Sequence, residues 1–380
     1  MEVKVLNNKE IWNRFLDKIK YLSFLQDYEY GEVEKNLARE VLRLGIFIET
    51  QKNELGNSDL KNKKKLVGLC QIIGYPGKRK GLVVHHGPVI KNIYFKKGIK
   101  KILEFLKNNR YDKNYNFLRI NPIKIYQQDN NNLKKNKNQY QKYLNLKNDN
   151  DNHNKEEKHK NPYLAVFKKL GFKIAPTYAV TENFWIKEIK DEENMMKEMS
   201  STCKKMLQDS LKKNFLEIEK TTDLKKIYIF WDIYLDLAKR KKFVPYSLDF
   251  IKEEFEIFSK ENKALLFLGK AQGKYYSAAL VIFSHQIAFY HHSASYPIKE
   301  PLNYKLQWEI IKEAKNRGCK FYNLWGIAIK ESKNHPWLGL TQFKKSLGGK
   351  LIKLLPTVDY KFSWKYYLTY FYEKIKRKKL

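Results

Sequence analysis

The apolar patterns in the two halves of this chain follow one another in the same order, and that order limits the folds open to it. The first half has a helical pattern, three strand-like runs, a second helical pattern and a last strand, at 10–20, 41–48, 66–75, 82–86, 96–109 and 117–120. The second half begins with a strand-like run at 177–186 and a helix at 191–213 with an acidic start and a basic continuation. Two helical patterns, three strands, a helix and a strand follow, at 224–239, 247–259, 264–270, 275–283, 286–292, 302–317 and 321–326. Strands that alternate with helices in this way predict two copies of one α/β (α+β) fold.

Length and composition agree with two compact units. The chain has 380 residues, of which 43% are hydrophobic, too many for a mainly disordered protein. We expect a first domain over 1–176, a second domain over 177–348 and a C-terminal tail over 349–380. Residues 127–161 are rich in Asn and Lys and poor in apolar positions, so they are predicted to form a disordered surface insertion.

The chain is strongly basic. Lys and Arg number 75 and Asp and Glu 41, which gives a formal net charge of +34. Such a charge attracts polyanions, so nucleic acid, a phosphorylated substrate and an anionic membrane surface are all admissible partners. Lysine and asparagine are abundant throughout while arginine is sparse, and this compositional bias leaves the choice among these partners open.

The cysteine and hydropathy patterns favour a cytoplasmic protein. Cys70, Cys203 and Cys319 lie far apart, in neither a CxxC pair nor a zinc-ligand spacing, which favours a reducing compartment. No run of about 18 uncharged apolar residues is available to span a membrane, and the first ten residues lack an apolar core.

Four histidines form two adjacent pairs, His85-His86 and His291-His292. Neither pair has a cysteine or an acidic residue at the spacing of a metal motif. Glycine-rich phosphate loops of the GxGxxG and GxxxxGK[ST] types are missing as well. We therefore expect no metal site and no cofactor.

The segment richest in ring residues and glycines lies near the C-terminus. A strand over 321–326 ends at Gly326, an aromatic loop follows at 335–337, and a short helix begins near Leu338 or Gly339 and ends at Gly348-Gly349. The free N–H groups at the start of that helix can meet a ligand. This pattern predicts a ligand-binding loop.

Here the sequence resembles a known family. The run NLWGI at 323–327, followed by HPWLGLTQFKKSLGG at 335–349, resembles the C-terminal hallmark of the Fem family, the aminoacyl-tRNA-dependent peptidyl transferases that build peptidoglycan interpeptide bridges. Other segments resemble the same family, namely Phe24-Leu25-Gln26 with Tyr30, Gly87-Pro88-Val89, Leu118 to Pro122, Leu170-Gly171-Phe172 and Tyr290 to Ser295.

The resemblance implies a fold and a reaction. The fold is a pair of GNAT-like acyltransferase domains, the N-terminal one completed by the C-terminal tail. The reaction moves an aminoacyl group from its tRNA ester to the side-chain amine of the stem peptide on a UDP-linked or lipid-linked muropeptide. The pyrophosphate loop of CoA-dependent GNAT enzymes is missing, as expected for a donor other than CoA. We also expect a monomer.

The resemblance implies that Lys344 and Phe343, the F-K pair of the C-terminal motif, are the catalytic residues. An ammonium at Lys344 can stabilise the oxyanion that develops during aminolysis, or hold the terminal phosphate of the tRNA. Phe343 would pack beside it. The alternative is that Lys344 is an exposed helix lysine, like most lysines of this chain.

The same resemblance suggests substrate-binding residues. Lys35 and Arg39 could pair with the diphosphate of the muropeptide carrier. Lys204, Tyr290 and Trp337 are further candidates for contacts with the substrates.

Two positions depart from the family pattern. Cys203 stands where the family usually has an arginine that holds the acceptor phosphates, so Lys204 or Lys205 would have to act as point charges. Asn121 stands before Pro122, where an acidic residue is often found, and an amide cannot act as a base. These departures leave open an acyltransferase of the same fold with another acceptor, while the charge also admits a basic RNA-binding module without catalysis.

The tail from Trp364 onward mixes aromatic residues with a basic end. This composition suits a helix that rests on an anionic membrane, where a lipid-linked acceptor would lie. It equally suits a packed terminal helix with an exposed basic end. The sequence leaves both interpretations standing.

Overall fold

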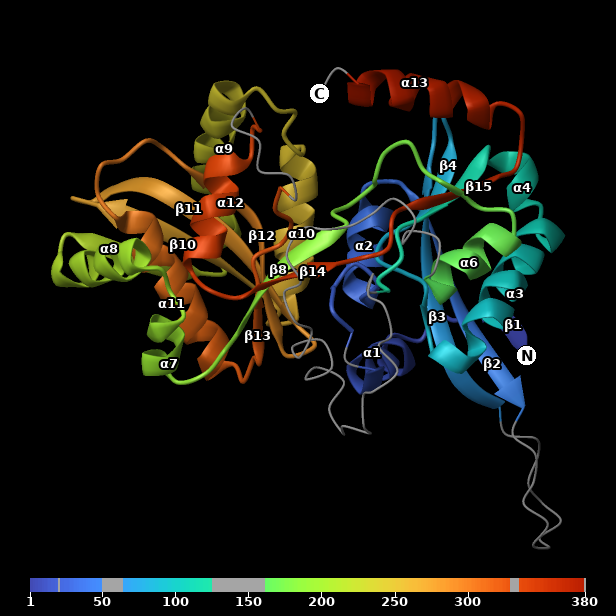
Figure 1. The fold of residues 1–380 in the computed structure, drawn as a ribbon, viewed down its shortest axis with the longest axis horizontal. Helices are drawn as coiled ribbons and strands as arrows, with labels where there is room; N and C mark the ends of the chain where they lie inside the picture. Colours follow the sequence, from blue (N-terminus) through green and yellow to red (C-terminus); the bar gives the residue numbers. More distant parts are fainter. Residues whose placement is uncertain (20, 50–63, 125–160, 329–334, 379–380) are drawn as a thin grey trace, which may run out of the picture. The chain divides into compact units, whose positions relative to one another are not determined.

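The computed structural model describes residues 1–19, 21–49, 64–124, 161–328 and 335–378. The chain forms two compact units, one of Met1–Glu182 with Lys353–Leu380 and the other of Asn183–Ile352 (Figure 1). The first unit extends past residue 176 because Ala175 N–H donates to the Thr357 carbonyl (2.9 Å) and the Glu182 carboxylate accepts from Thr357 N–H (2.7 Å). Except for Asn161, the predicted insertion at 127–161 lies outside the described residues.

The first unit is a sheet with helices on both faces. Its helices are α1 (Lys9–Ile19), α2 (Tyr28–Asn36), the 3-10 turn η1 (Asn92–Tyr94), α3 (Phe95–Asn108), α4 (Tyr111–Asn114), α6 (Pro162–Lys169) and α13 (Tyr366–Lys378). Its strands are β1 (Glu2–Val5), β2 (Glu40–Glu49), β3 (Lys64–Tyr75), β4 (Gly81–Val84), β5 (Val89–Ile90), β6 (Phe117–Ile120), β7 (Lys173–Ile174) and β15 (Val358–Lys361). The strand order is β1-β2-β3-β4-β6-β15-β7, with β5 paired to β3.

Apolar spacing decides how the helices cover this sheet. On α3, Ile99, Ile102, Leu103 and Leu106 recur at helical spacing and bury one face against the sheet. Phe167 of α6 joins the same cluster. On the opposite face, α1 packs its apolar side chains against residues of β3 and β5. Figure 1 shows the two helical layers on either side of the sheet.

The C-terminal segment returns to the first unit, as the sequence resemblance implied. Strand β15 pairs antiparallel with both β6 and β7. Arg119 on β6 donates from Nε and Nη2 to the two carboxylate oxygens of Asp359 on β15, both at 2.8 Å, and also pairs with Glu373 of α13. This buried arginine therefore ties the last strand and the last helix to the unit.

The second unit repeats the plan. Its helices are α7 (Glu192–Lys197), α8 (Ser201–Lys212), the 3-10 turn η3 (Leu224–Lys226), α9 (Ile227–Lys241), α10 (Leu248–Lys260), α11 (Leu302–Asn316) and α12 (Leu338–Ser346). Its strands are β8 (Asn183–Glu188), β9 (Leu216–Thr221), β10 (Ala264–Ala271), β11 (Lys274–Ser284), β12 (Ile287–Ser295), β13 (Phe321–Asn323) and β14 (Lys350–Lys353). The strand order is β14-β8-β13-β12-β11-β10-β9. Figure 1 shows α8 and α11 on one face and α9 and α10 on the other.

A parallel strand pair occupies corresponding positions in the two sheets. In the first unit β4 and β6 are parallel and joined by a connection that contains α3. In the second unit β12 and β13 are parallel and joined by α11. In each sheet a hairpin of long antiparallel strands precedes the pair. The expectation of two copies of one α/β fold is therefore confirmed.

One predicted helix is wrong in extent. The charge pattern over 191–213 predicts a single helix, but the structure has α7 and α8 with a break at 198–200. The break has a local cause, because the Ser200 hydroxyl accepts the N–H of Cys203 (3.2 Å) and caps a new helix. Asp191 caps the preceding helix in the same way through Asn194 N–H (2.9 Å).

A transmembrane span would need a helix both long enough and apolar enough, and none of the helices in the described ranges meets the two conditions.

Replacing Arg119 by methionine is expected to destabilise the protein by about 3 kcal/mol, because the buried Asp359 carboxylate loses its ion pair. Urea unfolding of the purified variant measures this loss. The double variant Arg119→Met/Asp359→Leu removes both charges and should recover most of the stability. Equal instability of the single and double variants would contradict the ion-pair explanation.

Candidate functional site

The backbone that follows β13 is held in place by side chains from two other elements. Asn183 of β8 donates its amide to the Ile327 carbonyl (3.1 Å) and accepts from Ile327 N–H (2.9 Å). From α12, the Thr341 hydroxyl accepts from Ala328 N–H (3.0 Å) and Lys344 Nζ donates to the Gly326 carbonyl (2.8 Å). The NLWGI run is therefore fixed from both sides before the chain leaves the described residues at 329.

Lys344 is the most unusual charged residue of this site. It is 5% exposed, so the alternative of an exposed helix lysine is wrong. Burial disfavours the ammonium form and lowers the pKa of Lys344 to about 7. A lysine with this pKa is close to half protonated at neutral pH, so it can donate a proton or a charged hydrogen bond.

The neighbouring residues of α12 are placed differently. Phe343 is half-buried, and its ring packs edge-on against Tyr304 of α11 with ring centroids 5.3 Å apart. Trp337 precedes the helix, is 44% exposed, and donates its backbone N–H to His335 Nδ1 (3.1 Å). Phe343 thus supports the helix, while Trp337 offers an exposed ring at its N-terminal end.

The paired glycines end α12 for a steric reason. Gly348 and Gly349 have φ of +81° and +106°, values that side-chain-bearing residues rarely adopt. A Cβ at Gly348 would lie 2.7 Å from the Glu198 carbonyl oxygen, and one at Gly349 would lie 2.6 Å from the Ile186 carbonyl oxygen. Close approach of the backbone to β8 and α7 therefore requires glycine at both positions.

Three other residues of the second unit that the sequence singled out differ in how far they are buried. Tyr290 is buried, its ring packs near Tyr322, and burial raises its pKa. Cys203 is buried in the core, where burial raises its pKa. Lys204 is half-buried on α8. Position 203, where the family usually has an arginine, therefore serves packing in this chain.

In the first unit, Lys35 and Arg39 lie at and just beyond the end of α2. Lys35 is exposed. Arg39 is half-buried, pairs with the buried Glu34 carboxylate, and lies 4.8 Å from the centre of the Tyr75 ring. Tyr75 in turn contacts His85 Nε2 through its hydroxyl (2.9 Å). Arg39 is therefore already neutralised by a carboxylate, whereas Lys35 is open to an anion.

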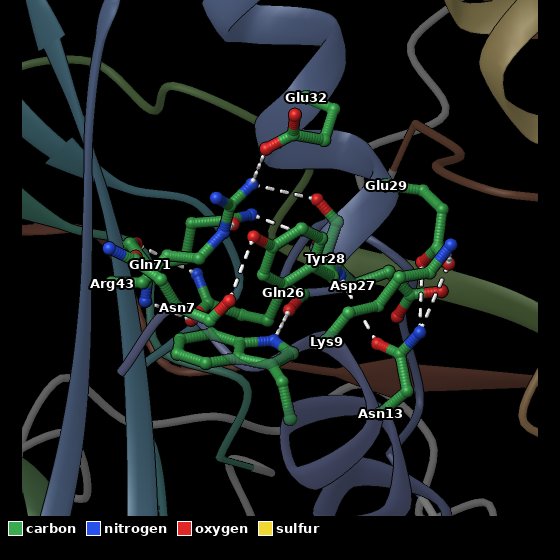
Figure 2. Close-up of polar contacts among 11 residues, drawn as sticks. Asn7, Lys9, Asn13, Gln26, Asp27, Tyr28, Glu29, Glu32, Arg43 and Gln71 are labelled. Carbon is green, nitrogen blue, oxygen red and sulfur yellow. Dashed lines mark hydrogen bonds and ion pairs between the residues drawn. The ribbon is translucent and has the colours of Figure 1, made fainter. Parts of the chain in front are cut away.

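The motif residue Gln26 has a structural role. Its amide donates to the carbonyls of Gln71 (3.1 Å) and His85 (2.9 Å) and accepts from Gln71 N–H (2.7 Å). Figure 2 shows that Arg43 completes this network, donating to Gln71 Oε1 (2.9 Å) and to Glu32 (2.8 Å). The network joins β2 and β3 to the segment before α2, which fixes the start of that helix.

Asn121 is buried and donates its amide to the Thr357 hydroxyl (3.0 Å). The position before Pro122 thus links β6 to the returning C-terminal segment.

Sequence reasoning missed Asn183 and Thr341, which hold the segment beside Lys344. Asn183 lies outside every motif singled out in the sequence, whereas Thr341 lies within the C-terminal motif but was given no role there. Their partners are backbone groups at 327 and 328, which only the fold brings within reach.

Comparison with known proteins gives two kinds of match. Residues 269–374 match the model of the FemAB family. The crystal structure of FemX is similar over 98% of this chain and 100% of that chain, with a TM-score of 0.74 and 15% identity. No curated protein matches the sequence.

Two further solved structures share the fold. A conserved protein of unknown function from Bacteroides thetaiotaomicron has a TM-score of 0.54 and 9% identity, covering 94% of this chain and 98% of that one. A tandem GNAT protein from the clavulanic acid biosynthesis pathway has a TM-score of 0.51 and 8% identity, and the match covers 95% of this chain and 98% of that one. The expected pair of GNAT-like units is confirmed.

The depressed pKa of Lys344 predicts a pH dependence of stability. Between pH about 7 and about 10.5, lysine keeps its proton in the unfolded chain but not in the folded one. In that window the free energy of unfolding of the wild type should rise by about 1.4 kcal/mol per pH unit relative to that of Lys344→Met. Below pH about 7 the difference in unfolding free energy between the two proteins should become constant, at the value least favourable to the wild type. Urea unfolding of both proteins across this range measures the slope. A difference that does not change with pH would contradict the burial of a neutral amine.

Proposed function

We propose that this protein is an aminoacyltransferase that uses aminoacyl-tRNA and extends the stem peptide of a peptidoglycan precursor. Two comparisons support the proposal: residues 269–374 match the model of the FemAB family, and the fold is similar to that of FemX. The family match supports a transferase in general. The finer assignment, with its tRNA donor and its UDP-linked or lipid-linked muropeptide acceptor, is our proposal. A cytoplasmic location follows from these substrates.

One observation carries the proposal. Lys344 lies within the family-matched segment, is buried, and points its amine at a backbone carbonyl in the NLWGI run. An exposed lysine would be one of many in this chain. A buried lysine with a pKa near 7 costs stability, and groups with strongly shifted pKa values concentrate at functional sites.

The reaction is the aminolysis of an ester. The nitrogen of the acceptor amine attacks the ester carbonyl carbon and forms a tetrahedral intermediate with a negative oxygen. The C–O bond to the tRNA ribose then breaks, and the proton lost by the amine goes to the ribose hydroxyl. The protonated amine of Lys344 can donate a hydrogen bond to that negative oxygen. Such a hydrogen bond is stronger in a site that excludes water.

The exposure of the remaining candidate substrate-binding residues decides which of them can contact a substrate. Lys35, Arg39 and Lys204 can offer positive charge to phosphates, and the exposed ring of Trp337 can stack on an adenine or a ribose. Arg39 would have to exchange its contact with Glu34 for a phosphate. Tyr290 contributes through packing, since its hydroxyl is buried.

The last helix supports contact with a membrane surface. Tyr366 and Thr369 of α13 are buried against the first unit, and the Tyr366 hydroxyl donates to Asp359 (3.2 Å). The opposite face is apolar and exposed, with Trp364 just before the helix and Tyr367, Leu368, Phe371, Tyr372 and Ile375 on it. Exposed lysines at 365, 374 and 376 flank this stripe. An apolar stripe between lysines suits the interface of an anionic bilayer, where a lipid-linked acceptor lies.

Transfer is tested by incubating the full chain with a set of charged tRNAs and a UDP-muropeptide and looking for a mass gain on the peptide. Lys344→Met should lower the transfer rate by about 10² to 10³-fold at pH 7. The control is Lys345→Met, the next lysine of α12, which lies over the Trp185 ring instead. No transfer by folded wild type from any charged tRNA would remove the proposal in favour of another acceptor or of RNA binding alone.

Membrane contact is tested by sedimentation with vesicles that contain phosphatidylglycerol. Leu368→Glu/Phe371→Glu should weaken binding at least about tenfold, because two apolar side chains no longer enter the interface. The control is Ile93→Glu/Val244→Glu, which alters two apolar residues outside α13 that are even more exposed than Leu368 and Phe371. Equal weakening by the two double variants would argue against α13 as the contact.

A further inference from the structure

A bulge in β12 turns two consecutive histidines to the same face of the sheet. Across the β11–β12 ladder, Leu280 lies opposite His292 and Val281 lies opposite Tyr290, so His291 is an extra residue. Consecutive side chains of a regular strand point to opposite faces, whereas an inserted residue re-aims its neighbour. The two imidazole rings accordingly lie with their centroids 4.0 Å apart.

A carboxylate from α10 meets both rings. Glu254 is fully buried, its Oε1 lies 3.3 Å from His291 Nε2, and its Oε2 lies 3.0 Å from His292 Nε2. One ligand atom from each of the three residues falls within 4.8 Å of the others. The expectation of no metal site rested on spacing along the chain, and the fold supplies an acidic partner from 37 residues before His291.

Glu254 and His292 have polar atoms that are short of partners. Within the described part of the chain, both carboxylate oxygens of Glu254 and Nε2 of His292 lack a hydrogen bond of good geometry, although the separations are short. A buried carboxylate without hydrogen bonds is costly. The Glu254 oxygens and the imidazole Nε2 atoms are close together but poorly oriented for hydrogen bonds, an arrangement that suits ligands of one shared metal ion.

From this geometry we propose that Glu254, His291 and His292 bind one divalent transition-metal ion of the zinc class. Bonds of about 2.0 to 2.1 Å in a tetrahedron separate neighbouring ligand atoms by about 3.3 Å, close to the two separations seen here. Two imidazoles with one carboxylate favour zinc over magnesium or calcium, which prefer oxygen ligands.

Aromatic rings surround the cluster and limit access of water. Tyr246 and Phe250 lie edge-on to His292, at 5.1 and 6.2 Å between centroids, and Trp325 lies 5.0 Å from His291. Trp325 directly precedes Gly326, whose carbonyl accepts from Lys344. A metal ion here would fasten α10 to β12, independently of which reaction the protein catalyses.

The alternative to a metal ion is a proton shared within the cluster of Glu254, His291 and His292. Burial opposes ionisation of Glu254, but the two histidines outweigh it and hold the pKa of Glu254 at about 2. A protonated histidine beside an ionised Glu254 would balance the charge without a metal. The two arrangements differ in metal uptake.

The experiment uses the full chain, stripped with a chelator and titrated with ZnCl₂ or CoCl₂. We expect the wild type to take up one equivalent, with a rise in melting temperature and visible absorption bands of tetrahedral cobalt. Glu254→Gln keeps the shape but loses the charged ligand and should raise the dissociation constant at least about 100-fold. Glu256→Gln, a half-buried position of the same helix that pairs with Lys260, is the matched control and should bind as the wild type does.

Two results would overturn the assignment. One is that folded wild type takes up neither ion. The other is that Glu254→Gln, with an unchanged circular dichroism spectrum, binds zinc as tightly as the wild type, which would place uptake on other histidines. If Glu254→Gln does not fold, His292→Gln takes its place with the same criteria.

Discussion

The removal of one lysine amine from water is the constraint on which the candidate site depends. Lys344 reaches the Gly326 carbonyl only because α12 begins after an aromatic loop and ends at two glycines that let the backbone approach β8 closely. Burial of the amine raises the cost of keeping it charged. The result is a pKa of about 7, whereas most other lysines of the described ranges are exposed or half-buried.

Buried and exposed basic residues differ in how their charge is balanced. Buried arginines are neutralised by carboxylates from distant segments, as Arg119 is by Asp359 and Glu373. Such ion pairs add little stability by themselves, but they determine which segments can meet. The exposed lysines account for the high net charge and give the surface an attraction for polyanions that is independent of the site.

Local patterns predicted the elements well wherever the apolar spacing was regular. The helix over 95–108 and the strands over 40–49 and 64–75 agree closely with expectation, because their apolar residues recur with one period. The pattern failed over 191–213, where a serine cap divides one apparent helix into α7 and α8. The charge gradient there suited one long helix, and the cap is a local hydrogen bond that periodicity does not record.

The site was predicted in part. The C-terminal motif placed a helix between an aromatic loop and a glycine pair, and the structure contains that helix as α12. Position 203 could not be interpreted from sequence, since a cysteine next to two lysines appeared to be a lost phosphate contact and is instead a core residue. The contacts of Asn183 with Ile327 were also hidden, because the two residues lie 144 positions apart in the chain.

The sequence by itself determined the order of elements, the repetition of one α/β plan in two halves and the family resemblance of the C-terminal motif. Periodicity and turn residues are local properties, so they can be read along the chain. Only the tertiary structure decided that Lys344 is buried, that Arg39 already has a carboxylate partner, and that Glu254 joins two histidines turned together by a bulge. Burial and charge pairing depend on everything that surrounds a side chain, and most of those neighbours come from distant parts of the sequence.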